Sequence, residues 1–147
     1  MLEYQAGQVL VGYNPSTNHD EEGIIQSIPR KIQVKDQLIA GDFLLLLSKD
    51  NTVLTNESLQ RYNDKHWGEL YKTKNNLLTA DQLKNIREKR HLTQEGLAKF
   101  LEIGKKDIAR YENGAIQTRV IDLLLRLIDD DASFVQMSRV FKEASTH

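Results

Sequence analysis

The stretch of sequence that decides the fold is Leu92–Gly114, which reads LTQEGLAKFLEIGKKDIARYENG. Thr93 is a good helix N-cap residue, and residues 94–102 place their apolar side chains on one helical face. A turn follows, and residues 105–113 have the pattern of a second amphipathic helix. Gly114 suits the left-handed position that commonly ends a helix. The stretch therefore predicts two short helices joined by a tight turn.

Small and apolar residues in this stretch indicate how the two helices pack. Ala98 is small enough to let the helices cross closely, and Gly104 is expected to permit the turn. Leu101 and Ile108 are placed to pin the second helix over the first. The second helix then keeps one polar face for contacts outside the domain.

The stretch resembles the helix-turn-helix of Xre-type (Cro/cI repressor) regulators. The matching positions extend beyond the apolar spacing and are Gln94, Ala98, Gly104, Glu112, Asn113 and Gly114. The resemblance implies that the second helix lies in the major groove of double-stranded DNA, with its N-terminal end facing the base edges. It also implies an ion pair between Arg87 and Glu112 with a structural role.

The same resemblance implies a set of DNA-contacting residues. These are Gln94, Lys105, Lys106, Ala109, Arg110 and Asn113. Arg110 is expected to pair with O6 and N7 of a guanine, and Ala109 is small enough to meet a thymine methyl group. Gln94 is expected to contact the DNA backbone and support the base-reading side chains, while Asn113 is expected to contact phosphate. Arg110 and Lys106 could instead touch only phosphate, which positions the protein without reading sequence.

A finer resemblance covers Leu77 to about Val135 and is to the C-terminal domain of MqsA (YgiT-type) antitoxins. It is carried by the segments Leu78–Thr79, Ile86–Lys89, Leu92–Gln94, Ala109–Gly114 and Gln117–Leu127. It implies a homodimer on a palindromic operator, neutralisation of a ribonuclease toxin, and base reading by Lys106 and Arg110. Those antitoxins also carry a zinc domain built on two cysteine pairs. This chain has no cysteine, so its N-terminal half is either a metal-free version of that domain or a different domain.

Around this stretch we predict an α+β protein with two domains. Residues 1–75 form a small β-rich domain that binds a partner or senses a ligand, and residues 76–147 form a five-helix domain for DNA binding and dimerisation. Three further helices complete the second domain. The first is expected from Ala80 to about Arg90, the second from about Thr118 to Asp129, and the last is capped by Asp130–Asp131 and reaches about Ala144. The first begins with a capping box, Thr79 to Gln82.

The N-terminal half is predicted from alternating and β-branched residues bounded by turn signals. The expected elements are a strand Gln8–Tyr13, one or two strands in Gly23–Val34, a turn around Ala40–Asp42, strands at Phe43–Leu47 and Val53–Leu54, a helix from Glu57 to about Tyr71, and a polar linker Lys72–Asn76. Trp67 either packs this helix on the sheet, which we favour, or belongs to an aromatic recognition patch.

The sequence outside the helix-turn-helix stretch gives no sign of a catalytic or metal site, and the basic residues of the chain gather in the second half. The runs His19–Glu22 and Asp64–His66 lack the ligand spacing of a metal or hydrolytic site, so we expect no catalytic residues, no metal, no cofactor and no enzyme activity. Met1–Tyr4 does not look like the start of a signal peptide, and we expect a cytoplasmic protein. The net charge is −1 and the pI about 6.4. Many basic residues fall in the second half: Lys84, Arg87, Lys89, Arg90, Lys99, Lys105, Lys106, Arg110, Arg119 and Arg126.

Two functions remain open from the sequence. One is an antitoxin-like repressor whose N-terminal half binds a toxin protein, and the other is a regulator whose N-terminal half senses a small ligand. In the helix over 118–129, the stretch Val120–Ile128 is apolar nearly all round and is expected to be buried on more than one side. Phe134, Met137 and Phe141 form a stripe on the last helix. This stripe either closes the domain's own core or pairs with a second copy in a dimer.

Overall fold

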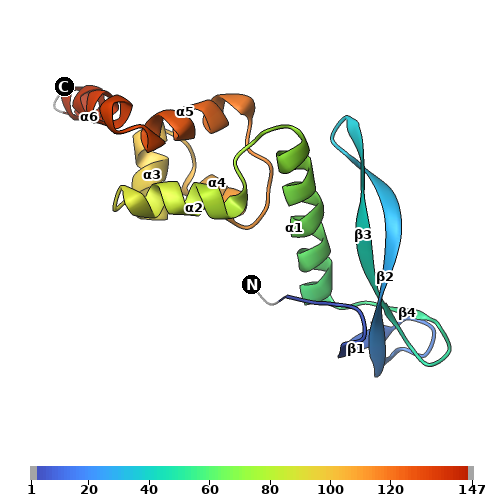
Figure 1. The fold of residues 1–147 in the computed structure, drawn as a ribbon. Coiled ribbons are helices and arrows are strands. Elements are labelled where there is room, and N and C mark those ends of the chain that lie inside the picture. Colours follow the sequence, from blue (N-terminus) through green and yellow to red (C-terminus); the bar gives the residue numbers. More distant parts are fainter. Residues whose placement is uncertain (1–2, 146–147) are drawn as a thin grey trace. The chain divides into compact units, whose positions relative to one another are not determined.

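The computed structural model describes residues 3–145, and side chains for residues 3–143. The chain divides into two compact units, Met1–Tyr71 and Lys72–His147, which are described separately below (Figure 1). The division falls within the helix α1 (Glu57–Lys74). None of the helices in residues 3–145 is long and apolar enough to cross a lipid bilayer. The molecule is α+β, as the sequence predicts.

The N-terminal unit is built on a four-stranded antiparallel sheet in the order β1-β2-β3-β4. Its strands are β1 (Val9–Asn14), β2 (His19–Val34), β3 (Gln37–Leu47) and β4 (Val53–Leu54). The inner face buries Ile25, Leu44, Leu46 and Leu54 together with Leu59 of α1. Backbone hydrogen bonds between Tyr13 and Thr55 also join the end of β1 to the residue after β4, which curls the sheet.

The long hairpin of β2 and β3 decides between one and two strands in Gly23–Val34 and corrects the turn expected after them (Figure 1). Residues 19–34 form one continuous strand, and the chain turns at Lys35 and Asp36, where Lys35 has a φ of 53°. The turn expected around Ala40–Asp42 is wrong, because this segment pairs with β2 throughout. Gly41 is needed there for a close approach: an added Cβ would lie 2.6 Å from Leu70 Cδ1 and 3.2 Å from Trp67 Cη2.

Helix α1 packs its aromatic and apolar side chains on the sheet. Trp67 is 5% exposed, which confirms its predicted role in packing. The side chain of Asn63 hydrogen-bonds to the backbone of Leu44 as a neighbouring strand would. The Leu44 N–H donates to Asn63 Oδ1 at 3.2 Å, and the Leu44 carbonyl accepts from Asn63 Nδ2 at 3.0 Å. The predicted linker over 72–76 is wrong in its first part, since residues 72–74 are helical and Lys72 is fully buried.

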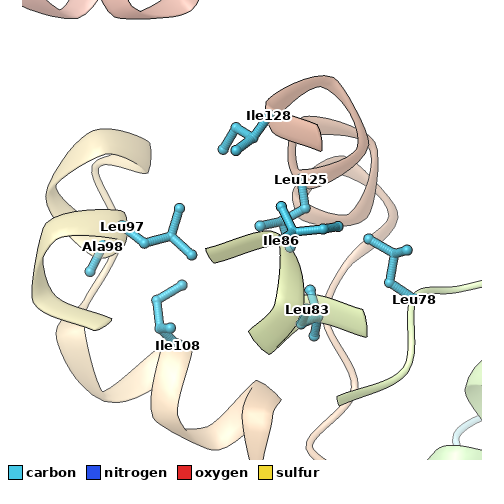
Figure 2. Close-up of a cluster of buried hydrophobic side chains, with 8 residues drawn as sticks. All are labelled: Leu78, Leu83, Ile86, Leu97, Ala98, Ile108, Leu125 and Ile128. Atoms are coloured by element: carbon cyan, nitrogen blue, oxygen red, sulfur yellow. The ribbon is translucent and has the colours of Figure 1, made fainter. Parts of the chain in front are cut away.

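The C-terminal unit contains five helices after α1 within the described residues. They are α2 (Ala80–Lys89), α3 (Gln94–Leu101), α4 (Lys105–Glu112), α5 (Arg119–Asp129) and α6 (Asp131–Ser145). The predicted capping box is present at the start of α2, with Thr79 and Gln82 in its two roles. Figure 2 shows the core, in which side chains from the segment before α2 and from α2, α3, α4 and α5 converge: Leu78, Leu83, Ile86, Leu97, Ala98, Ile108, Leu125 and Ile128.

A buried carboxylate fixes α5 against the segment that leads into α2. Asp122 is 0% exposed, and its oxygens accept from Leu78 N at 2.7 Å, Gln117 Nε2 at 3.1 Å and Arg126 Nε at 2.8 Å. Burial by itself raises the pKa of Asp122, but these three hydrogen bonds outweigh it and lower the pKa below its usual value. The charged form of Asp122 is therefore part of the folded state.

We predict that Asp122→Asn destabilises the protein by about 2 kcal/mol at pH 7, because the amide nitrogen cannot accept the hydrogen bonds that the carboxylate accepts. The folded-state pKa is lowered, so the carboxylate's contribution is complete above its unfolded value of about 3.9 and is lost as the pH falls below it. Denaturant unfolding from pH 7 to pH 3 should show wild type and variant converging at acid pH. Asp81→Asn, an exposed change on α2, is the control, and a constant gap at all pH values would contradict the prediction.

Candidate nucleic-acid interface

The turn between α3 and α4 depends on Glu102 and not on Gly104, the residue that the sequence suggests. Thr93 Oγ1 accepts from Gly96 N at 2.9 Å and starts α3. The left-handed residue of the turn is Glu102, with a φ of 56°, whereas Gly104 is the N-cap of α4 with an extended backbone. The expected role of Gly104 in permitting the turn is therefore wrong, because its φ of −68° is open to any residue.

The end of α4 has the expected geometry. Asn113 is the C-cap, and Gly114 follows with a φ of 108°, a conformation that favours glycine. Asn113 Nδ2 donates to the Ala109 carbonyl at 2.8 Å. The Asn113 side chain is thus folded back on its own helix in this structure, where the sequence prediction gave it a phosphate contact.

Helix α4 separates an inward side from an outward side. Ile108 is 2% exposed and packs in the core of Figure 2. The outward side carries Lys105, Lys106 and Arg110, all exposed, while Ala109 lies half-buried among them. Gln94 is half-buried at the start of α3. The structure therefore places three cations of the predicted set on one exposed helix, at and just after its N-terminus.

The ion pair predicted between Arg87 and Glu112 is present. Arg87 Nε and Nη2 donate to the two carboxylate oxygens of Glu112 at 2.8 and 2.9 Å, and Arg87 Nη1 donates to the Leu92 carbonyl at 2.9 Å. The hydrogen bond with Glu112 raises the pKa of Arg87 further above its ordinary value, against the opposing effect of burial. This bidentate pair links α2 to the last residue of α4.

Other polar residues that position α4 escape sequence reasoning. Lys72 Nζ donates to the Tyr111 carbonyl at 3.3 Å, near the end of α4 where a positive charge is favourable. Nothing in the polar run that contains Lys72 distinguishes it from its exposed neighbours. Sequence reasoning also missed Asp107, an acid among the basic residues of α4, and its charge is the signal that could have found it.

The two units differ in formal charge. Residues 72–147 hold fourteen basic and eleven acidic residues, a formal charge of +3, and residues 1–71 hold six basic and ten acidic residues, a charge of −4. Two outward cations of α4 have acidic neighbours: Arg110 Nη1 lies 3.2 Å from Asp107 Oδ1, and Lys105 Nζ lies 3.6 Å from Glu95 Oε2. The unit with the positive formal charge is therefore the one that contains α4.

Comparison with known proteins agrees with this geometry. A family model described as a helix-turn-helix domain matches residues 80–129, the span from the start of α2 to the end of α5. Residues 80–129 form a helix-turn-helix domain. No curated protein and no solved structure matches the chain. The helix-turn-helix domain supports a role as a DNA-binding regulator, with DNA as a partner.

We predict that Arg110→Ala and Lys105→Ala weaken DNA binding in different ways. Loss of Arg110 should cost about 1–3 kcal/mol and relax the preference at one base pair. Loss of Lys105 should weaken binding to all sequences alike and reduce the salt slope by about one unit. Titration of duplexes selected from a randomised library, at several salt concentrations, measures both. Unchanged affinity and sequence preference in Arg110→Ala would exclude Arg110 as a base reader.

Proposed function

We propose that the protein is a sequence-specific transcriptional repressor of the antitoxin kind, which binds a palindromic operator as a homodimer and neutralises a toxin protein through its N-terminal unit. On this proposal it acts by binding and not by catalysis. One observation supports the proposal above the others: each unit leaves a contiguous apolar surface uncovered. Surfaces of this kind are typical of protein–protein contacts.

The uncovered surface of the helical unit lies on α5. Val120, Leu123 and Leu127 are 66%, 53% and 47% exposed and share one helical face. The opposite side of α5 buries Leu125 and Ile128 in the core. The expectation that this helix is buried on more than one side is thus not met within a single chain, and a second copy would supply the missing cover.

The aromatic stripe of α6, unlike the apolar face of α5, packs within the unit. Phe134 and Phe141 pack against Phe100 with ring centroids 5.7 and 5.2 Å apart, and Met137 packs against the same core. Of the two interpretations of this stripe, closure of the domain's own core is the one that the contacts favour. We therefore assign the dimer contact to α5. A two-fold dimer doubles the DNA contacts and matches a palindromic site.

We predict that Leu123→Asp in the full chain makes the protein monomeric and weakens binding to a palindromic duplex, because the interface would bury a charge on both sides of the two-fold axis. Leu38→Asp, at the tip of the β2–β3 hairpin, makes the same change at another exposed leucine and serves as the control. Light scattering measures the mass, and the unfolding temperature checks the fold. A Leu123→Asp protein that remains dimeric would rule out this face of α5.

The uncovered surface of the N-terminal unit is a row across the outer face of the sheet. Val9 pairs with Ile24, Ile24 with Leu47, and Leu47 with Val53, so the row crosses all four strands. Val9, Ile24 and Val53 are 58%, 56% and 48% exposed. Side chains opposite one another on neighbouring strands lie within contact distance, and the row is therefore continuous.

Charge next to this row favours a basic protein as its occupant. Asp20 and Glu22 alternate along β2 with Ile24 and lie on the same face. A two-fold contact between copies would bring these carboxylates toward each other, whereas a basic partner would pair with them. The formal charge of −4 on residues 1–71 acts in the same direction.

We predict that the product of the neighbouring gene, co-expressed with this chain, co-purifies with it and that Ile24→Lys abolishes co-purification by placing a positive charge in the row. Leu38→Lys is the matched control, since it adds the same charge to another exposed residue of the unit. DNA affinity should be the same in both variants. A stable complex with Ile24→Lys would show that the partner binds elsewhere, and a wild-type chain that binds no such product would contradict the antitoxin role.

A further inference from the structure

Helix α4 carries one acid beside the residue predicted to read a base. Asp107 is the third residue of α4, and its Oδ1 accepts from Arg110 Nη1 at 3.2 Å. The Asp107 side chain is 37% exposed and that of Arg110 67% exposed. The two residues are three positions apart and are therefore neighbours on the helix surface.

An acid at this place is unfavourable for DNA binding as such. A carboxylate close to the phosphate backbone repels it, so Asp107 lowers affinity for every sequence alike. A negative charge in the first turn does stabilise a helix. That benefit would be the same for an acid turned away from Arg110, and it does not account for the contact between the two side chains.

The contact changes what Arg110 can do. A free arginine side chain samples many rotamers, and part of this freedom is lost when it binds a base. A carboxylate that already holds one guanidinium nitrogen reduces this loss and limits the directions in which the remaining donors point. A guanidinium has five N–H donors, so four remain for the O6 and N7 atoms of a guanine.

We propose that Asp107 is a positioning residue that sets the base preference of Arg110, an inference that rests on the proposed sequence-specific binding. When Arg110 meets its guanine, the pair with Asp107 is kept and the arginine donates to both partners. When Arg110 turns to a phosphate instead, Asp107 is left unpaired beside the DNA backbone. Asp107 therefore increases discrimination between sites and lowers affinity for non-operator DNA.

The chain offers a matched control. Glu95, on α3, lies 3.6 Å from Lys105 on α4, so it is a second acid next to a cation on this surface. Lysine lacks the forked geometry that reads guanine, and its partner acid is not expected to affect base preference. Glu95→Ala removes the same charge from the same surface and should raise affinity for all duplexes alike.

The experiment uses the full chain as wild type, Asp107→Ala, Asp107→Asn, Glu95→Ala, Arg110→Ala and the double variant Asp107→Ala with Arg110→Ala. A duplex is selected with the wild type from a randomised library, and each protein is titrated against it, against duplexes changed at the Arg110 base pair, and against a scrambled duplex. Asp107→Ala should lose about tenfold in preference at that base pair, the size of one good base contact, and bind the scrambled duplex more tightly. Asp107→Asn, which keeps an acceptor oxygen, should be intermediate.

In the Arg110→Ala background, Asp107→Ala should not change base preference further, because the two residues act through one contact. A merely structural role for Asp107 would lower the unfolding temperature and weaken all duplexes together, with the preference unchanged. Wild-type preference in Asp107→Ala, or an equal loss without Arg110, would overturn the inference. A wild-type protein that selects no sequence from the library would instead overturn the proposed sequence-specific function, and this inference with it.

Discussion

The orientation of α4 depends above all on the ion pair between Arg87 and Glu112. Both side chains are nearly buried, at 12% and 7% exposure, so each charge has lost most of its water. The bidentate hydrogen bonds and the third bond to the Leu92 carbonyl compensate for that loss. If α4 rotated about its axis and carried Glu112 away, Arg87 would be a buried cation without its partner. The pair therefore fixes the rotation of α4 about its axis, and with it the side that Arg110 and Lys106 face.

Several weaker constraints act on the same helix. Ile108 anchors its middle in the core, Gly114 ends it, and Lys72 contacts the Tyr111 carbonyl near its C-terminus. These contacts come from segments far apart in the sequence. Preorganisation of this kind reduces the entropy lost when the helix enters a groove, so a small domain can keep more of its interaction free energy for binding.

The helical unit was predictable because its signals are local. Thr79 and Thr93 cap helices through bonds to residues three positions away, and the expected bounds of α2 to α6 differ from the observed ones by a residue or so. The N-terminal unit was less predictable because its geometry depends on distant contacts. Gly41 looks like a turn glycine in sequence, and only the approach of Trp67 and Leu70 shows why a strand needs it. Lys72 was missed because the sequence alone does not distinguish a buried lysine from an exposed one.

The residues that break the local pattern lie on the surfaces to which we assign function. A solvent-facing position on α5 or on the outer sheet face would normally be polar, yet Leu123 and Ile24 are exposed there. A basic, DNA-facing helix would normally exclude an acid, yet Asp107 contacts Arg110. The folding of a single chain requires none of these three choices, since Leu123 and Ile24 leave apolar area exposed to water and a neutral polar residue could stand in place of Asp107. A second copy, a basic protein and a guanine would each turn one of these unfavourable positions into a favourable contact. On this reasoning the sites of binding in a small regulator are found where side chains depart from what the fold alone requires.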